Sequence, residues 1–107
     1  MTRSAHERFA DMLAAIERCQ AYARHLDETG ELASMAYDAI LRNLAVLGEA
    51  VRALPEEARA EYPDVPWPAI AGLRNVVVHE YFRVDPDLVR DIVENQLTPL
   101  ADQLRAR

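Results

Sequence analysis

The 107-residue chain has one cysteine, Cys19, three glycines and no lysine, so all twelve of its basic residues are arginine. A single cysteine excludes an intramolecular disulfide and any zinc site built from several cysteines. We expect Cys19 to be a small, partly buried residue on an amphipathic helix. Purely apolar runs extend over only a few residues, and no signal peptide, membrane span or lipidation motif is found. The sequence therefore predicts a cytoplasmic protein with no membrane partner.

Positive charge is also scarce, because 18 acidic residues outnumber 12 basic ones and give a formal net charge of −6. A protein that coats a long nucleic acid is normally basic. The composition excludes a broad basic surface of that kind. Any role with nucleic acid is left to a few arginines in a cleft.

Several kinds of catalytic site are missing from the sequence. The three histidines lie on three different predicted helices, and no Glu-x-x-His pair of the di-iron type occurs. The glycines are isolated, so there is no phosphate-binding glycine loop. Neither serine lies in a nucleophile elbow. We therefore expect no metal and no cofactor.

Hydrophobic spacing and capping residues predict two long helices in the first half of the chain. Ser4 and Glu7 form a capping box at the start of a helix that ends near residues 27–30. A second helix begins at about Glu31 and stops before Pro55. Its apolar residues form one long stripe: Leu32, Met35, Ala36, Ala39, Ile40, Leu44, Leu47, Val51 and Leu54.

Prolines mark the helix starts in the second half. Pro55 opens a short helix to about residue 62, and Pro68 opens another after the loop "YPDVPWP" at residues 62–68. Asp85 and Pro86 supply the N-cap and first turn of a last helix.

Pro99 should kink that last helix. No segment of the sequence has the period of two that is typical of a strand. We predict an all-α fold, an antiparallel bundle of four to five helices, in a single domain over residues 1–107.

The helix before the last one contains "RNVVVHEYF", residues 74–82. At about 100° per residue, Leu73 and Val77 share the expected core face, and Asn75 and His79 lie nearly opposite it. A helix that is apolar beyond one stripe is usually buried on more than one side. We therefore predict that a second copy of the chain covers this helix in a homodimer.

The polar residues of this helix have ordinary structural explanations. Arg74 could pair with a carboxylate such as Glu49. His79 lies near a helix C-terminus, where the helix dipole favours a positive charge. Tyr81 could simply fill the core.

The same residues could also cleave a phosphodiester. The guanidinium of Arg74 fits a phosphate, and a histidine such as His79 can move protons because it changes charge between pH 5 and 8. In RNA the 2′-hydroxyl is already placed as a nucleophile, so no metal is needed. Asn75 could hydrogen-bond the imidazole or the phosphate, and Tyr81 could contact base or backbone. One arginine and one histidine make a sparse site, and a twofold dimer would supply two of each.

The stretch from Arg74 to Tyr81 resembles the Arg-x-x-x-x-His-x-Tyr signature of HEPN-domain ribonuclease toxins of the HepT type. Asn75 fits the polar residue that typically follows the motif arginine. The segments "ILRNLAVLGEAVRALP" (40–55) and "YPDVPWPAIAGLRN" (62–75) also resemble blocks of that family, in the same order. The resemblance covers roughly residues 40–90.

This resemblance implies a homodimeric bundle of HEPN type that cleaves RNA without metal, in a cleft between the motif helices. Arg74 and His79 would be the catalytic pair, and Asn75 a supporting residue. It also implies a toxin–antitoxin system, in which a minimal nucleotidyltransferase antitoxin neutralises the toxin by transferring AMP to Tyr81. An adenylyl group would add bulk and negative charge where the substrate phosphate must bind.

Two other interpretations stay open at this point. The chain could be a non-catalytic HEPN module that partners a nucleotidyltransferase, or a purely structural helical dimer. The acidic composition indicates that a cleft supplies most of the affinity for RNA. Arg42 and Arg83 are the candidates for additional RNA contacts.

Overall fold

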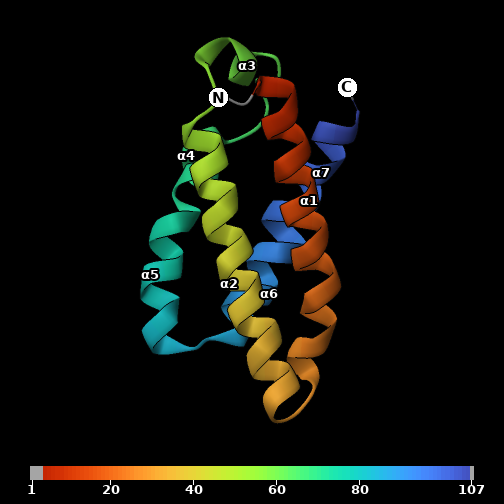
Figure 1. The fold of residues 1–107 in the computed structure, drawn as a ribbon, viewed down its shortest axis with the longest axis vertical. Coiled ribbons are helices and arrows are strands. Elements are labelled where there is room, and N and C mark those ends of the chain that lie inside the picture. Colours follow the sequence, from red (N-terminus) through yellow and green to blue (C-terminus); the bar gives the residue numbers. More distant parts are fainter. Residues whose placement is uncertain (1–3, 107) are drawn as a thin grey trace.

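The computed structural model describes residues 4–106, and for Tyr81 and Phe82 it describes the backbone alone. The described part of the chain is helical and contains no strand, so the predicted all-α class is confirmed (Figure 1). The elements in chain order are α1 (Ala5–Ala23), the 3-10 turn η1 (Arg24–Asp27), α2 (Glu31–Arg52), α3 (Glu56–Ala60), α4 (Trp67–Ala71), α5 (Leu73–Arg83), α6 (Pro86–Ile92), the π-helical segment η2 (Val93–Leu97) and α7 (Thr98–Arg105).

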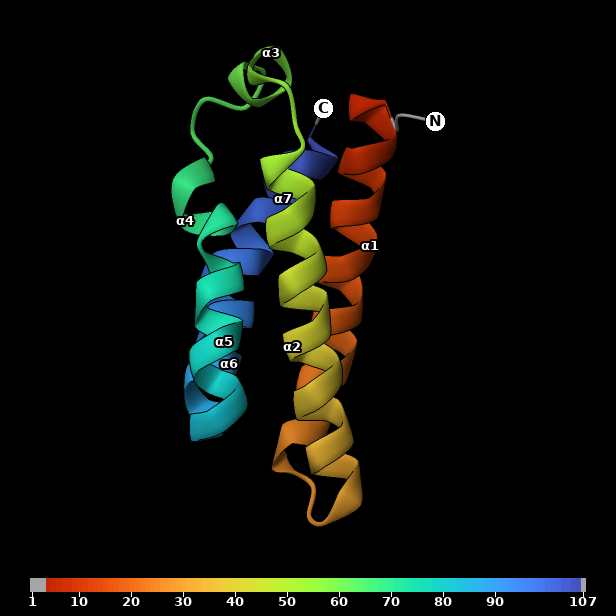
Figure 2. The ribbon, with the colours of Figure 1, turned by 60° about the vertical axis from the view of Figure 1, so that its left-hand side comes forward.

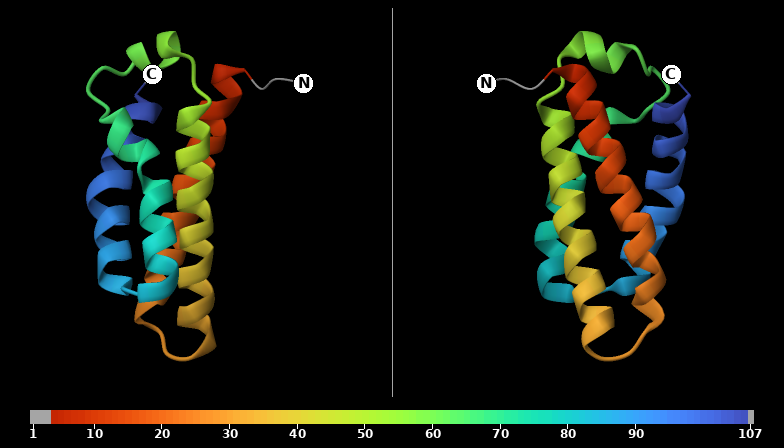
Figure 3. Two further views of the ribbon diagram at one scale, coloured as in Figure 1. Left: turned by 90° about the vertical axis from the view of Figure 1, so that its left-hand side faces the viewer. Right: turned by 45° about the vertical axis from the view of Figure 1, so that its right-hand side comes forward.

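Helix α2 occupies the centre of the bundle. It packs against α1 on one side and against α4 and α5 on the other, and the α6–η2–α7 rod packs behind α1 and α2 (Figures 1 and 3). The molecule measures about 43 × 25 × 25 Å. No helix in residues 4–106 is long and apolar enough to cross a membrane.

The capping residues act as predicted at the start of α1 and at the start of α6. The Glu7 amide donates to Ser4 Oγ at 3.1 Å, and the Ser4 amide donates to Glu7 Oε1 at 3.2 Å, which completes the capping box of α1. The Leu88 amide donates to Asp85 Oδ1 at 3.2 Å, and Pro86 occupies the first turn of α6.

The core lies where α1, α2 and the last helices meet, and each contributes fully buried aliphatic side chains: Met12, Ile16, Ile40, Leu44, Leu47, Leu97 and Leu100. Cys19 is buried more completely than predicted, with its Sγ 3.9 Å from the carbonyl oxygen of Ile40. Burial raises the pKa of the Cys19 thiol to about 12. A thiol held so firmly in its neutral form is a packing residue.

The interruption predicted at Pro99 takes the form of a π-helical segment. Val93–Leu97 is wound as a π-helix between α6 and α7, and Thr98 Oγ1 donates to the carbonyl oxygen of Val93 at 3.2 Å. Pro99 has no amide proton to donate to a carbonyl group of the preceding turn. The wider π-helical turn before it lets the α6–η2–α7 rod continue with few carbonyl groups that lack a hydrogen-bond donor.

The stripe predicted for α2 is wrong at its first two members. Leu32 is 45% exposed and Met35 is 64% exposed. Figure 2 shows the reason, because the turn between α1 and α2 projects past the ends of α5 and α6. These two helices therefore do not cover the first turns of α2, where η1 is the neighbour. Helical periodicity identifies a face of a helix and does not reveal how far its neighbours extend.

The helix predicted from Pro68 onward is divided in two. It begins one residue earlier, at Trp67, and separates at Gly72 into α4 and α5. Trp67 Nε1 donates to the carbonyl oxygen of Arg59 at 3.0 Å, and the Trp67 ring lies 6.4 Å from that of Tyr62, between centroids. Phe9 of α1 joins this aromatic cluster, with its ring centroid 5.1 Å from that of Tyr62. The cluster fixes the proline-rich loop to α1 and sets where the following helix begins.

Candidate functional site

Three polar residues of α5 lie on its outward face. Arg74, Asn75 and His79 are all exposed, and Val78 between them is 59% exposed. Leu73 is buried on the opposite face, as the helical spacing predicts. At 100° and 1.5 Å per residue, Arg74 and His79 are separated by about 140° around the helix and about 7.5 Å along it. Within one copy they therefore flank Val78 and do not converge on one point.

Arg74 is held by a carboxylate of α2. Its Nη1 lies 2.7 Å from Glu49 Oε1, and both side chains are about half exposed. The pairing that the sequence predicted as the ordinary explanation is thus present. It uses one nitrogen of the guanidinium, so the other N–H groups of Arg74 stay free to bind an anion. Pairs this exposed are weak, on the order of 0–1 kcal/mol, and a phosphate can displace the carboxylate.

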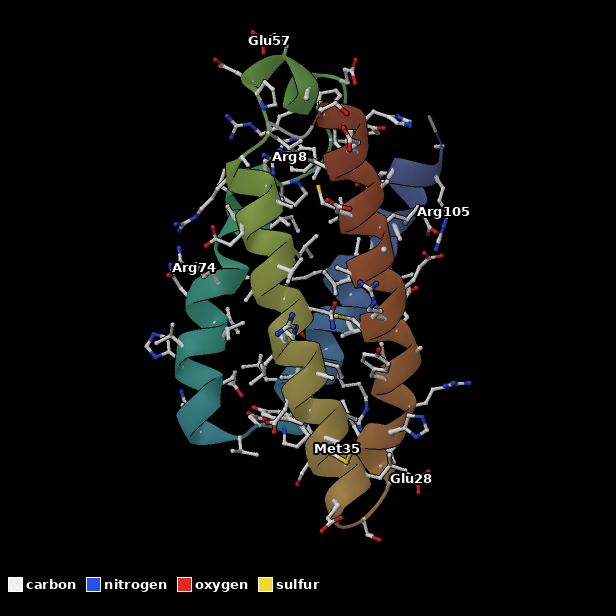
Figure 4. The ribbon with its side chains drawn as sticks, in the orientation of Figure 1. Arg8, Glu28, Met35, Glu57, Arg74 and Arg105 are labelled. Atoms are coloured by element: carbon white, nitrogen blue, oxygen red, sulfur yellow. The ribbon has the colours of Figure 1, made fainter. Side chains whose placement is uncertain are left out.

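Gly48 determines how closely α5 approaches α2 at Arg74. A Cβ atom at Gly48 would lie 3.2 Å from the carbonyl oxygen of Ala71 and 3.3 Å from the amide nitrogen of Arg74. Both are backbone atoms and cannot turn aside as the end of a side chain could. The absence of a side chain at Gly48 thus places Arg74 against α2, beside Glu49 (Figure 4).

The carboxyl end of α5 is anchored by a buried polar network. Glu80 is only 2% exposed, and its Oε2 lies 2.9 Å from the hydroxyl of Tyr37 on α2. The Asp85 amide donates to Glu80 Oε2 at 3.1 Å and to the Tyr37 oxygen at 3.0 Å. Burial and the adjacent Glu80 carboxylate together raise the pKa of Tyr37 to about 12, although the Asp85 amide opposes the shift. This network fixes the turn that follows His79.

Val84 adopts the left-handed conformation at the end of α5, with φ of 50° and ψ of 80°. This conformation costs a residue other than glycine about 1–2 kcal/mol. Val84 is also 59% exposed, so its side chain packs little. The strain is maintained because the next residue, Asp85, is held by Tyr37 and Glu80.

Val84→Gly is expected to raise the free energy of unfolding by roughly 0.5–1 kcal/mol, since relief of the left-handed strain exceeds the added flexibility of the unfolded chain. Val78→Gly is the matched control, because Val78 is equally exposed on the same helix with helical backbone angles. Chemical denaturation should show Val78→Gly destabilised by about 0.5–1 kcal/mol. Destabilisation of both variants would contradict the strain at Val84.

Arg42 lies apart from Arg74 and His79, whereas Arg83 follows His79 by four residues and therefore lies one turn beyond it on α5. Arg42 is exposed on α2 and lines a groove between α1 and α2. Arg83 is exposed in the last turn of α5, at the far end from Arg74. The Tyr81 side chain, predicted as the AMP acceptor, lies outside the described residues. Asn75 and His79 are both exposed on α5, and within the described residues no hydrogen bond joins their side chains. The predicted supporting role of Asn75, towards the imidazole or the phosphate, stays a prediction.

Sequence reasoning missed Glu80, Tyr37 and Gly48. One signal could have identified Glu80, because it follows Leu73 by seven residues and therefore shares its core face. A carboxylate predicted on a core face requires a hydrogen-bonding partner, and a tyrosine is a common one. The close approach at Gly48 has no counterpart in the sequence pattern, since it depends on where α4 and α5 cross α2.

Comparison with known proteins identifies the family. The family model described as "Ribonuclease HepT-like" matches residues 12–107. "Probable ribonuclease HepT" of Thermococcus cleftensis is 28% identical over 94% of this chain and 92% of its own length. "Putative RNase MJ0127" of Methanocaldococcus jannaschii is 44% identical over 55% of this chain and 49% of its own.

Apart from the Thermococcus cleftensis protein, six relatives that match this chain, including MJ0127, are covered over only 39–61% of their length. No solved structure matches this chain. The family model nevertheless covers almost the whole chain, including every residue of the α5 site. The chain therefore belongs to the HepT-like ribonuclease family.

Proposed function

We propose that this chain is a metal-independent endoribonuclease whose catalytic residues are Arg74 and His79, with Asn75 in support. The observation that carries this proposal is the exposed arc of α5, where all three side chains face outward from a helix anchored at both ends. Membership of a family described as ribonuclease supports the same function.

The proposed reaction is a transesterification within RNA. A histidine accepts the proton of the 2′-hydroxyl, the 2′-oxygen attacks phosphorus, and the bond from phosphorus to the 5′-oxygen breaks. A second proton donor protonates the departing 5′-oxygen, which leaves a 2′,3′-cyclic phosphate and a 5′-hydroxyl. Arg74 binds the phosphate oxygens and stabilises the negative charge that grows on them, after exchanging Glu49 for the substrate.

A homodimer with the two α5 helices face to face supplies the groups that one copy lacks. In one copy Arg74 and His79 lie about 140° apart around α5, on either side of exposed Val78. A second copy across a twofold axis would cover Val78 and bring the histidine of each copy towards the arginine of the other. The two histidines then serve as base and acid.

Cleavage of a labelled RNA by the purified chain in excess EDTA tests the proposed function. We expect products that end in a 2′,3′-cyclic phosphate and begin with a 5′-hydroxyl. Cleavage that appears only when a divalent metal is added would contradict the mechanism. If RNA or a nucleotidyltransferase is bound without any cleavage, the chain is the non-catalytic binding module instead.

We further propose that the chain is the toxin of a cytoplasmic toxin–antitoxin pair, neutralised by a nucleotidyltransferase that adenylylates Tyr81. Tyr81 lies two residues after His79 in α5. An adenylyl phosphate at this position would present negative charge to Arg74 of the assembled site. That charge would compete with the phosphate of the substrate.

Co-expression with the candidate nucleotidyltransferase is expected to increase the intact mass of the chain by one or more AMP units and to suppress cleavage. Tyr81→Phe should abolish the mass gain while Tyr22→Phe, the matched change on α1, should leave it intact. A gain of mass that survives Tyr81→Phe would place the modification elsewhere and contradict this proposal.

A further inference from the structure

A groove of about 730 Å³ lies between α1 and α2. Figure 4 labels one of its lining residues, Arg8. Arg8 and Arg18 of α1 and Arg42 of α2 line the groove. Alanines of the two helices, among them Ala14 and Ala45, form much of the rest of its lining. Small side chains leave room for a ligand to approach the helices, while the longer arginines reach out beside it. Asp11 and Glu49 also line the groove, so three arginines and two carboxylates surround it and its net charge is positive.

Within residues 4–106 the three arginines of the groove, like Arg24, Arg52, Arg59 and Arg83, lack the ion pairs that hold Arg74, Arg90 and Arg105. Arg90 pairs with Asp27 and Asp87, and Arg105 pairs with Glu17 and Asp102. What distinguishes the groove arginines is that all three line one hollow.

In the described part of the chain, no carboxylate lies within ion-pair distance of Arg8, Arg18 or Arg42. Such pairing would be easy to provide in a chain with 18 acidic residues and 12 basic ones. Positive charge left unpaired in one groove of an acidic protein is available to a polyanion.

The groove leads towards the α5 site. Glu49 lines the α2 side of the groove and is the residue that pairs with Arg74. Along α1, Arg8 and Arg18 are ten residues apart, which corresponds to about 15 Å. At about 3.4 Å for each stacked nucleotide, this length accommodates roughly four nucleotides. A second hollow continues from the groove past Arg18 and Arg42 to Tyr22, whose ring could stack on a base.

We propose that the α1–α2 groove binds the sugar–phosphate backbone of single-stranded RNA that flanks the cleaved phosphate, through Arg8, Arg18 and Arg42. The inference rests on the proposed ribonuclease function, because continuity with Arg74 is what favours RNA over an acidic peptide. Backbone contacts of this kind bring affinity without base specificity. The groove thus holds a longer substrate, while Arg74 and His79 act on one phosphate of it.

The test compares two double variants that remove the same charge. Arg18→Ala/Arg42→Ala empties the groove of its two exposed arginines, and Arg24→Ala/Arg105→Ala removes two exposed arginines from outside it. The probe is a fluorescent 12-nucleotide 2′-O-methyl RNA, which binds but offers no 2′-hydroxyl for cleavage. Its affinity is measured by anisotropy at several salt concentrations, and circular dichroism checks that each variant is folded.

The groove variant is expected to bind the probe at least tenfold more weakly than the wild type at low salt. Its slope of log affinity against log salt should be smaller by about 1.4, or about 0.7 for each lost phosphate contact with a single strand. The control variant should bind within about twofold of the wild type.

Equal binding by the wild type and the groove variant would overturn the proposal, as would an equal loss in the control variant or no binding of the probe at all. Failure of the proposed function looks different. If the groove variant loses affinity for the probe but natural RNA is never cut, the groove is supported as an RNA-binding site and the proposed nuclease function is contradicted. If the groove variant cuts RNA of every length at the wild-type rate, the proposed nuclease function is supported and the proposed role of the groove is contradicted.

Discussion

Replacement of His79 by alanine is expected to reduce the rate of RNA cleavage by a factor of about 10²–10⁴, the contribution typical of a general acid or base. The loss should appear in kcat, because the imidazole moves a proton in the transition state and contributes little to binding of the ground state. His79 is exposed, so its removal leaves the core untouched. The measurement is single-turnover cleavage of a labelled RNA in EDTA.

His6→Ala provides the matched control for this variant. His6 is also an exposed helical histidine, but it lies in the first turn of α1. Its removal should leave the rate unchanged and the melting temperature of both variants close to that of the wild type. Unchanged cleavage by both His79→Ala and Arg74→Ala would exclude the catalytic assignment.

Replacement of Glu80 by alanine is expected to lower the free energy of unfolding by about 3 kcal/mol. The change leaves the Tyr37 hydroxyl without its carboxylate partner and the Asp85 amide with one acceptor fewer, and it opens a cavity beside α5. Glu80→Gln is the conservative control, because it keeps the shape and an acceptor oxygen, and it should cost much less. Urea denaturation of the two variants measures the difference.

A double-mutant cycle separates the network from the cavity. Tyr37→Phe alone should cost about 1–2 kcal/mol, and the double variant with Glu80→Ala should cost less than the sum, because both changes break the same hydrogen bond. Strict additivity would show that the two residues act independently and would contradict the network.

The raised pKa of Tyr37 makes the free energy of unfolding depend on pH in the alkaline range. The folded value of about 12 lies above the usual 10, so the unfolded chain releases this proton first as the pH rises. The stabilisation is complete below pH 10 and is lost between pH 10 and 12. Tyr37→Phe should remove this part of the alkaline loss, while the part due to buried Cys19, between pH 9 and 12, remains.

The local features of this fold could be predicted from the sequence because they depend on neighbouring residues. The capping box of Ser4 and Glu7 and the start of α6 at Asp85 and Pro86 are both confirmed. The outward face of α5 follows from spacing alone, and so does the exposure of His79. Periodicity is a property of a single helix, so it predicts the features that depend on that helix alone, such as which side chains share a face.

What the sequence could not reveal depends on how far two elements overlap in space. Leu32 and Met35 fit the core stripe of α2 and are nevertheless exposed, since α2 is longer than the helices beside it. Glu80 is a charged residue on a face that buries it, and its partner Tyr37 is 43 residues away in the chain. The pairing of Arg74 with Glu49 was within reach, because both are helical residues of opposite charge, although only the packing of α5 on α2 makes it possible.

Gly48 has a consequence for how mutations of this chain would be interpreted. A substitution there brings a Cβ atom to 3.2 Å from the carbonyl oxygen of Ala71 and 3.3 Å from the amide nitrogen of Arg74, so the backbone that bears the arginine must give by a few tenths of an ångström. A screen that scores cells by RNA cleavage would therefore rank Gly48 with the residues that touch the substrate. A screen that scores folding would rank it with ordinary helix positions. If the two screens disagreed at Gly48, the disagreement would show that the contact between α2 and α5 at this glycine controls the position of Arg74 in the site.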